Sequence, residues 1–145
     1  MDLPIDPNDC NCLAVRQAAR QITKLYDDAL APYGLRATQF GVLSRLARTG
    51  PLPVLALAEA LAIDRTTLSH NLQPLERDGL VVSATDDADR RVRRIALTAA
   101  GKKKLLAAKS AWARAQRRFH EAYGADDAAL LRTSLRRAAA VAVVD

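Results

Sequence analysis

Apolar residues recur at helical spacing along most of the 145-residue chain, which predicts a mainly α-helical protein. In four segments an apolar or small residue returns every three or four positions, so these residues share one face of a helix. The four segments are residues 10–31, 38–48, 99–123 and 126 or 127 onward. Thr38 and Thr98 are expected to cap two of these helices, because a hydroxyl oxygen accepts hydrogen bonds from a first turn. Residues 1–9, with Pro4 and Pro7, are expected to form an irregular arm.

Residues 53–78 have the pattern of two short helices separated by a tight corner. The second helix is expected to begin at Asp64 and to end near Asp78, before Gly79. Its leucines recur at spacings of four and three and are expected to be buried; they are Leu68, Leu72 and Leu75. The opposite face and its flanks are polar; they carry Arg65, Thr66, Thr67, Ser69, His70, Asn71, Gln73 and Arg77. Hydroxyl, amide and guanidinium groups suit phosphate oxygens and base edges.

A charged hairpin is predicted to follow this helix. Residues 81–84 form a short β-type run, residues 86–89 have turn chemistry, and residues 91–97 alternate apolar and basic positions. Four arginines lie within five positions, and they are expected to repel one another unless an anion lies opposite. A polar helix face alone is equally typical of a solvated surface. The basic hairpin beside it favours a DNA backbone as the missing anion.

This order of elements is that of a winged helix-turn-helix, and the chain resembles the MarR family of bacterial transcription regulators from about Cys12 to the last helix. The residues that carry the resemblance are Asp64-Arg65-Thr66-Thr67-Leu68, Leu75-Glu76-Arg77-Asp78-Gly79-Leu80-Val81, Asp89-Arg90-Arg91 and Ile95-x-Leu97-Thr98-x-x-Gly101. The resemblance implies that the second helix lies in the major groove and that Arg91, oriented by Asp89, reaches the minor groove. Arg90 and Arg93 complete the expected DNA-binding set. Two positions depart from the family pattern: Ala62 stands where glycine is frequent, and Pro74 is expected to bend the helix.

The terminal helices are expected to form a homodimer. Residues 10–34 and 99–145 carry apolar stripes that one chain of this size has little left to bury, whereas residues 36–98 form the winged helix-turn-helix unit. The resemblance implies the same arrangement, with terminal helices of two chains interlocked. A two-fold dimer predicts a roughly palindromic operator with half-sites about 10 bp apart.

Composition agrees with a nucleic-acid partner. The formal charge is +6 and the isoelectric point is near 9.8, which favours a polyanionic partner. No apolar run approaches the roughly twenty residues that span a bilayer, and no secretory signal is evident, so a cytoplasmic protein is expected. Cofactors and enzymatic activity are not expected, because the nucleotide-binding and hydrolase motifs are missing from the sequence.

Cys10 and Cys12 are the sequence's candidate redox residues. One interpretation is a helix start with one small buried thiol, and the other is a redox switch, as in MarR regulators with a peroxide-sensing cysteine. Two positions apart on a helix the thiols would point to different faces, which favours a bridge between subunits over one within a chain. With only His70 and His120 in addition, a metal site is not expected.

A small aromatic effector is the commonest ligand in the family that the chain resembles. The candidate pocket residues are Arg16, Arg20, Tyr26, Tyr33, Phe40 and Trp112. Ordinary core aromatics and solvated arginines are the competing interpretation. The prediction is a sequence-specific DNA-binding dimer that acts as a repressor and is released by such a ligand or by cysteine oxidation. The alternative is an architectural dimer that binds DNA without sequence choice.

Overall fold

The computed structural model describes residues 5–141, which are mainly helical with one small sheet. The α-helices are α1 (Asn11–Leu30), α2 (Ala37–Thr49), α3 (Val54–Leu61), α4 (Arg65–Arg77), α5 (Ala99–Tyr123) and α6 (Ala125–Val141). Two short 3-10 helices, Pro7–Asp9 and Ala31–Tyr33, precede α1 and follow it. The strands are β1 (Leu52–Pro53), β2 (Val81–Thr85) and β3 (Arg93–Leu97).

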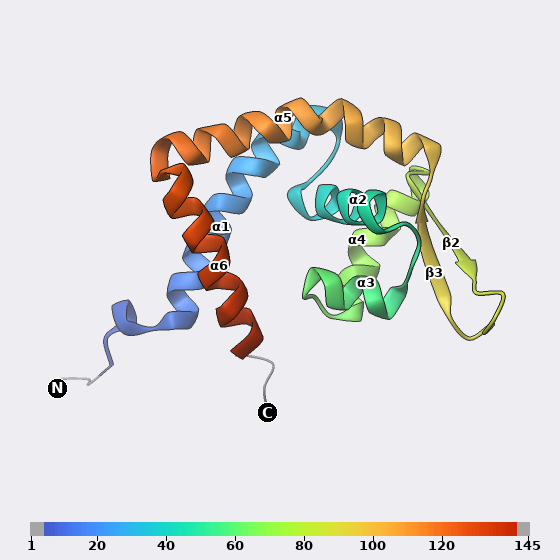
Figure 1. Cartoon of the computed structure of the whole chain (residues 1–145), viewed down its shortest axis with the longest axis horizontal. Coiled ribbons are helices and arrows are strands. Elements are labelled where there is room, and N and C mark those ends of the chain that lie inside the picture. Colours follow the sequence, from blue (N-terminus) through green and yellow to red (C-terminus); the bar gives the residue numbers. More distant parts are fainter. Residues whose placement is uncertain (1–4, 142–145) are drawn as a thin grey trace.

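The long helix α5 connects two halves of the molecule (Figure 1). In this view α1 and α6 lie below one end of α5, and α2, α3, α4 and the sheet lie below the other. Both halves touch α5, which packs against α1, α2 and α6.

The hydrophobic core lies almost entirely in that unit. Its largest fully buried side chains come from α2, α3, α4 and β3, together with Leu30 at the end of α1. Leu68, Leu72 and Leu75 of α4 are all buried, which confirms the sequence prediction for this face. Leu30 is the one buried residue of α1, and Ala128 is the one buried residue of α6. The apolar stripes of α1 and α6 are thus largely unburied within a single chain, whereas α5 buries Ala108, Ala111 and Ala115.

The three-stranded antiparallel sheet has the order β1-β3-β2. Val81 lies opposite Leu97, and Thr85 lies opposite Arg93. The sequence placed the start of the last strand at Arg91, and this was wrong. Residues 86–92 form a hydrogen-bonded turn, because the Val92 N–H donates to the Asp89 carbonyl (3.0 Å) and the Asp86 N–H donates to the Val92 carbonyl (2.8 Å).

Helix starts are where the sequence analysis was least accurate. Thr38 does not cap α2: the Ala37 N–H donates to the Asp27 carboxylate of α1 (2.7 Å), and the Arg36 N–H donates to Gln39 Oε1 (3.0 Å). Pro53 lies in β1, which is too short for a pattern to reveal, and α3 begins at Val54. Thr98 caps α5 as predicted, accepting from the Gly101 N–H at 3.0 Å.

The remaining predicted boundaries differ by at most two residues from those observed. The last helix begins at Ala125, just before Asp126, and residues 7–9 of the expected arm form a short helix. Residues 1–4 of that arm, and Ala142 at the end of the last stripe, lie outside the described part of the chain.

Ala62 forms the corner between α3 and α4 in a left-handed conformation, with φ of 54°. For a residue with a Cβ this costs about 1 kcal/mol, so the departure from glycine is a real strain at this corner. Helix α4 continues through Pro74 to Arg77, and the Pro74 carbonyl accepts from the Asp78 N–H at 3.0 Å.

The end of α4, the sheet and the start of α5 meet at one tight junction. The Thr98 N–H donates to the Leu80 carbonyl (3.1 Å), and the Thr98 hydroxyl donates to the Gly79 carbonyl (2.6 Å). A Cβ added at Gly101 would lie 2.0 Å from the Leu80 carbonyl oxygen. The Leu97-Thr98-x-x-Gly101 signature is therefore a packing requirement between α5 and the segment that follows α4.

We expect Gly101→Ala to lower the free energy of unfolding by about 3 kcal/mol, because α5 must move off a backbone oxygen. Gly41→Ala in α2 is the matched control, since a Cβ there meets nothing within 4 Å. The control should be neutral or up to about 1 kcal/mol more stable, from helix propensity. Urea unfolding followed by circular dichroism measures both. Equal stability of the two variants would contradict the packing requirement at Gly101.

Candidate nucleic-acid interface

Helix α4 presents the predicted polar face to solvent. Arg65, Thr66, Ser69, His70 and Gln73 are exposed, whereas the leucines of the opposite face are buried. Of the other predicted residues on this helix, Thr67 and Arg77 are exposed and Asn71 is half-buried. The face is thus free of large apolar groups and rich in donors, as contacts to phosphates and base edges require.

Asp64 holds the start of this helix. Its carboxylate accepts from the Thr67 N–H (2.7 Å) and from the Thr67 hydroxyl (3.0 Å). The backbone hydrogen bond from Thr67 lowers the pKa of Asp64. The stability that this cap contributes is therefore complete above the usual pKa of an aspartate and is lost only as the pH falls through the lowered value. At neutral pH the Asp64 carboxylate is charged, and the Thr67 hydroxyl proton is already used in the hydrogen bond to Asp64.

A groove of about 620 Å³ separates α4 from the sheet, and it brings the two predicted regions together. Arg65, Ser69 and Gln73 line it from α4, one turn apart, and Arg91 and Arg93 line it from the other side. We call this the α4–wing groove, with "wing" meaning β2, β3 and the turn between them. Residues far apart in the sequence thus meet in one groove, whose lining also includes Glu76 and the apolar residues Pro53, Val54, Leu55, Leu72, Val92 and Ile95.

Other predicted residues lie outside this groove. Arg77 borders a separate hollow with Arg36, Pro74 and Asp78, and its Nε lies 3.5 Å from the Asp78 carboxylate. Arg90 lies at the tip of the wing. Thr66, Thr67, His70 and Asn71 are also not among the groove-lining residues.

The wing arginines have carboxylate partners within the chain. Arg91 pairs with Asp89 (3.2 Å), Arg93 with Glu76 of α4 (3.7 Å) and Arg94 with Asp86 (2.9 Å). The prediction that the mutual repulsion of these arginines requires an external anion was therefore wrong, because carboxylates of the same chain supply the negative charges. Arg90 is the member of the group with no ion pair among residues 5–141.

The Asp89–Arg91 pair implied by the family resemblance is present. Asp89 Oδ1 accepts from both the Arg91 N–H (3.1 Å) and the Arg91 Nε (3.2 Å). The Arg91 side chain is nevertheless 92% exposed, so its guanidinium extends from the wing into solvent. Arg91 Nη2 also lies 3.5 Å from Asp89 Oδ2, so Asp89 engages one edge of the guanidinium and leaves Nη1 available to an anion.

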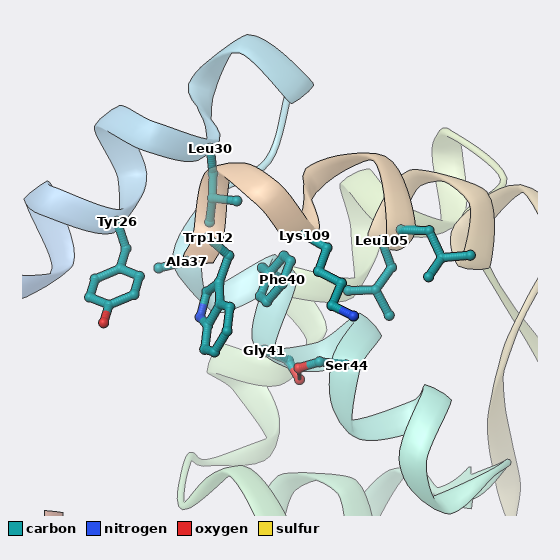
Figure 2. Close-up of a pocket in the computed structure, with 10 residues that line it drawn as sticks. Tyr26, Leu30, Ala37, Phe40, Gly41, Ser44, Leu105, Lys109 and Trp112 are labelled. Atoms are coloured by element: carbon teal, nitrogen blue, oxygen red, sulfur yellow. Dashed lines mark hydrogen bonds between the residues drawn. The ribbon is translucent and has the colours of Figure 1, made fainter. Parts of the chain in front are cut away.

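A second hollow, of about 430 Å³, lies between α1, α2 and α5 (Figure 2). Phe40 stacks on Trp112 with ring centroids 6.0 Å apart and planes at 10°. Tyr26 and Lys109 border the same space, and the Tyr26 hydroxyl hydrogen bonds to Gln116 Oε1. Burial raises the pKa of Tyr26, partly offset by Arg132, so this hydroxyl keeps its proton at neutral pH. The walls are mostly apolar, and Lys109 is the cation that lines them.

The sequence analysis identified only part of this pocket. Tyr26, Phe40 and Trp112 line it, whereas Arg16, Arg20 and Tyr33 do not. Arg16 and Arg20 are exposed on α1, and Tyr33 packs against the core. Lys109, which lines the pocket, and Gln116, which bonds to Tyr26, were not predicted, although each lies three or four positions from Trp112 on α5 and so shares its face.

Both cysteines are free, with Cys10 half-buried and Cys12 exposed. Cys10 precedes α1 with extended backbone, and Cys12 is the second residue of the helix. The expectation that both thiols sit on a helix was therefore wrong, and helical spacing says nothing about a bridge between them. Among residues 5–141, no three His, Cys, Asp or Glu side chains gather as a metal site would require. None of the helices described is both long and apolar enough to cross a bilayer.

A helix pair with a tight corner, a polar second helix and a two-stranded basic hairpin define a winged helix-turn-helix protein. The MarR family profile matches residues 33–92, which contain α2, α3, α4 and β2 and end just before β3. MosR of M. tuberculosis, a transcriptional regulator whose crystal structure contains DNA, is 35% identical. The alignment covers 92% of this chain and 96% of MosR, with a TM-score of 0.84. The chain belongs to the MarR family of transcription regulators.

Two further relatives support this assignment. The SarZ regulator of Staphylococcus epidermidis is 32% identical over 91 residues, which are 63% of this chain and 62% of SarZ. The chain thus matches less than two thirds of the length of that regulator. CouR, a transcriptional repressor solved on a 23-mer DNA duplex, is 28% identical with a TM-score of 0.81. That alignment covers 96% of this chain and 99% of CouR.

Proposed function

We propose that this protein is a homodimeric, sequence-specific repressor that binds DNA through the α4–wing groove and is released by a small effector. The observation that carries the proposal is the convergence of Arg65, Ser69 and Gln73 with Arg91 and Arg93 on one groove. Similarity to MosR and CouR, whose structures contain DNA, supports it. Catalysis has no part in this proposal, and the cytoplasm, where bacterial DNA lies, is the expected location.

The proposed dimer buries the apolar residues that a single chain leaves exposed on its terminal helices. Leu13 and Val15 of α1 are 42% and 48% exposed, and Leu130 and Val141 of α6 are 66% and 68% exposed. Apolar side chains this exposed on helices that bury one residue each favour a partner surface. A second copy of the chain supplies the same apolar faces through a two-fold axis.

A two-fold dimer places two copies of α4 in successive major grooves, with each wing beside the adjacent minor groove. We expect DNase protection of a pseudo-palindrome whose half-site centres lie about 10 bp apart. Binding should survive a large excess of random duplex, because specific sites are typically bound about 10³-fold or more tightly than random DNA. Loss of binding at modest competitor excess would instead favour an architectural protein, and a monomer in analytical ultracentrifugation would contradict the dimer.

Arg91→Ala should weaken operator binding by about tenfold or more, because it removes an exposed cation aimed out of the wing. If Arg91 lies against phosphates at the groove edge, the slope of log K against log salt should become shallower by about 0.9. Arg137→Ala on α6 is the control, since Arg137 is also exposed but lies outside the groove. Fluorescence anisotropy across a salt series measures both variants. Equal losses would contradict the assignment of the wing.

The pocket between α1, α2 and α5 supports an aromatic anion as the releasing effector. Its size falls within the range of about 300–1,000 Å³ of small-molecule sites. Stacked Phe40 and Trp112 provide flat apolar walls, and Lys109 provides a positive charge. A ligand that contacts α1, α2 and α5 together favours one arrangement of the terminal helices relative to the DNA-binding unit. Release then follows from a changed separation of the two α4 helices.

Aromatic carboxylates should quench Trp112 fluorescence and release DNA from the wild type, and Lys109→Met should need at least about tenfold more ligand because the charge partner is lost. Arg20→Met is the control, since Arg20 does not line the pocket. Hydrogen peroxide tests the alternative of thiol oxidation in the same assay. Release by peroxide that disappears in a Cys10→Ser/Cys12→Ser variant, with no response to aromatic acids, would assign the switch to the cysteines.

A further inference from the structure

Asp86 organises the wing turn, which comprises residues 86–92, through three separate hydrogen bonds. Its N–H donates to the Val92 carbonyl (2.8 Å), and Oδ1 accepts from the Ala88 N–H (2.8 Å). Its other carboxylate oxygen, Oδ2, accepts from Arg94 Nη1 at 2.9 Å. Only 18% of the Asp86 side chain is exposed, although the turn itself lies at the surface. Asp86 thus joins both ends of the turn to β3.

Arg94 connects this turn to a different part of the chain. While Nη1 bonds to Asp86, Nη2 donates to the Pro51 carbonyl at 3.3 Å, just before β1. Pro51 is 43 positions away in sequence and belongs to the loop that leads into β1 and α3. The planar guanidinium donates to both acceptors at once, which a lysine cannot do with the same geometry. The wing turn is therefore tied to the body of the DNA-binding unit.

Arg94 differs in this respect from the arginines around it. Arg91 is 92% exposed and borders the α4–wing groove, whereas the Arg94 side chain is 43% exposed and does not line the groove. The hydrogen bond from Arg94 is also the main cause of the lowered pKa of Asp86, so the pair is ionised at neutral pH. Sequence alone places Arg94 among four equivalent cations, and the contacts separate it from them.

We propose that Arg94 and Asp86 are positioning residues, which fix the wing turn so that Arg91 is presented to DNA, and that Arg94 does not itself contact the duplex. The inference rests on the proposed role of the wing. It also implies that Asp86, although acidic, strengthens DNA binding. Simple electrostatics predicts the opposite sign, because removing a negative charge near DNA strengthens binding.

The sign of the Asp86→Ala effect is the primary test. Asp87→Ala is the matched control, since Asp87 is the adjacent residue, is exposed, and makes no hydrogen bond or ion pair with the described residues. Both variants remove one negative charge from the wing. We expect Asp86→Ala to weaken operator binding about fivefold to tenfold, and Asp87→Ala to bind equally well or up to about threefold more tightly.

Arg94→Gln and the double variant Asp86→Ala/Arg94→Gln provide the second test. Arg94→Gln should also weaken binding about fivefold to tenfold, with the salt slope unchanged, because no phosphate contact is lost. The double variant should lose no more operator affinity than the single variant with the larger loss, since the two residues act through one connection. Hydrogen exchange of the Ala88 and Val92 amides in the DNA-free protein should accelerate in both single variants, which reports directly on the turn.

Tighter binding by Asp86→Ala would overturn the proposal, as would a salt slope shallower by about 0.9 in Arg94→Gln, which identifies a phosphate contact. Unchanged exchange at Ala88 and Val92 in both single variants would overturn it as well. Arg91→Ala is measured in parallel, so that a failure of the positioning role can be told apart from a failure of DNA binding by the wing. If Arg91→Ala weakens binding and the other variants do not, the wing still contacts DNA and only the positioning role is lost.

Discussion

The geometry of the DNA-binding unit depends on the close contact of α5 with the segment that follows α4. Thr98 bonds to the Gly79 and Leu80 carbonyls, and Gly101 leaves no room for a side chain against Leu80. This contact joins three elements within a few residues: the end of α4, the first residues of β2 and the start of α5. Because α5 extends from there to the terminal helices, the same junction connects the polar face of α4 to the surface proposed for dimerisation.

Carboxylates, rather than cations alone, define the wing. Three aspartates and four arginines lie within residues 86–94, so the local charge is nearly balanced and the function of each arginine depends on its partner. Asp89 holds Arg91 at the surface, Glu76 draws Arg93 toward α4, and Asp86 directs Arg94 inward. Such pairs contribute little stability when exposed. Their consequence is geometric, because they decide which guanidinium groups are available to an anion.

Two hydrogen bonds of α1 lie beside the aromatic pocket, one to α2 of the DNA-binding unit and one to α5. Asp27 of α1 caps α2, and the neighbouring Tyr26 bonds to Gln116 of α5 across the same space. A molecule in the pocket would lie beside both connections. Under the proposed mechanism, such a ligand would change the orientation of α4 through these pocket walls, because the walls belong to the elements that would move.

The sequence by itself determined the elements whose signals are local. Leucine spacing predicted the buried face of α4, Asp64 and Thr98 predicted their helix starts, and Gly79 predicted the end of α4. Composition, polar patterning and the family signature together predicted the winged helix-turn-helix. Only the tertiary structure decided which charges pair, that Asp27 rather than Thr38 caps α2, and that Lys109 rather than Arg16 or Arg20 lines the pocket. Those outcomes depend on side chains from different elements that meet only after packing, and a pattern along one element carries no information about its partner.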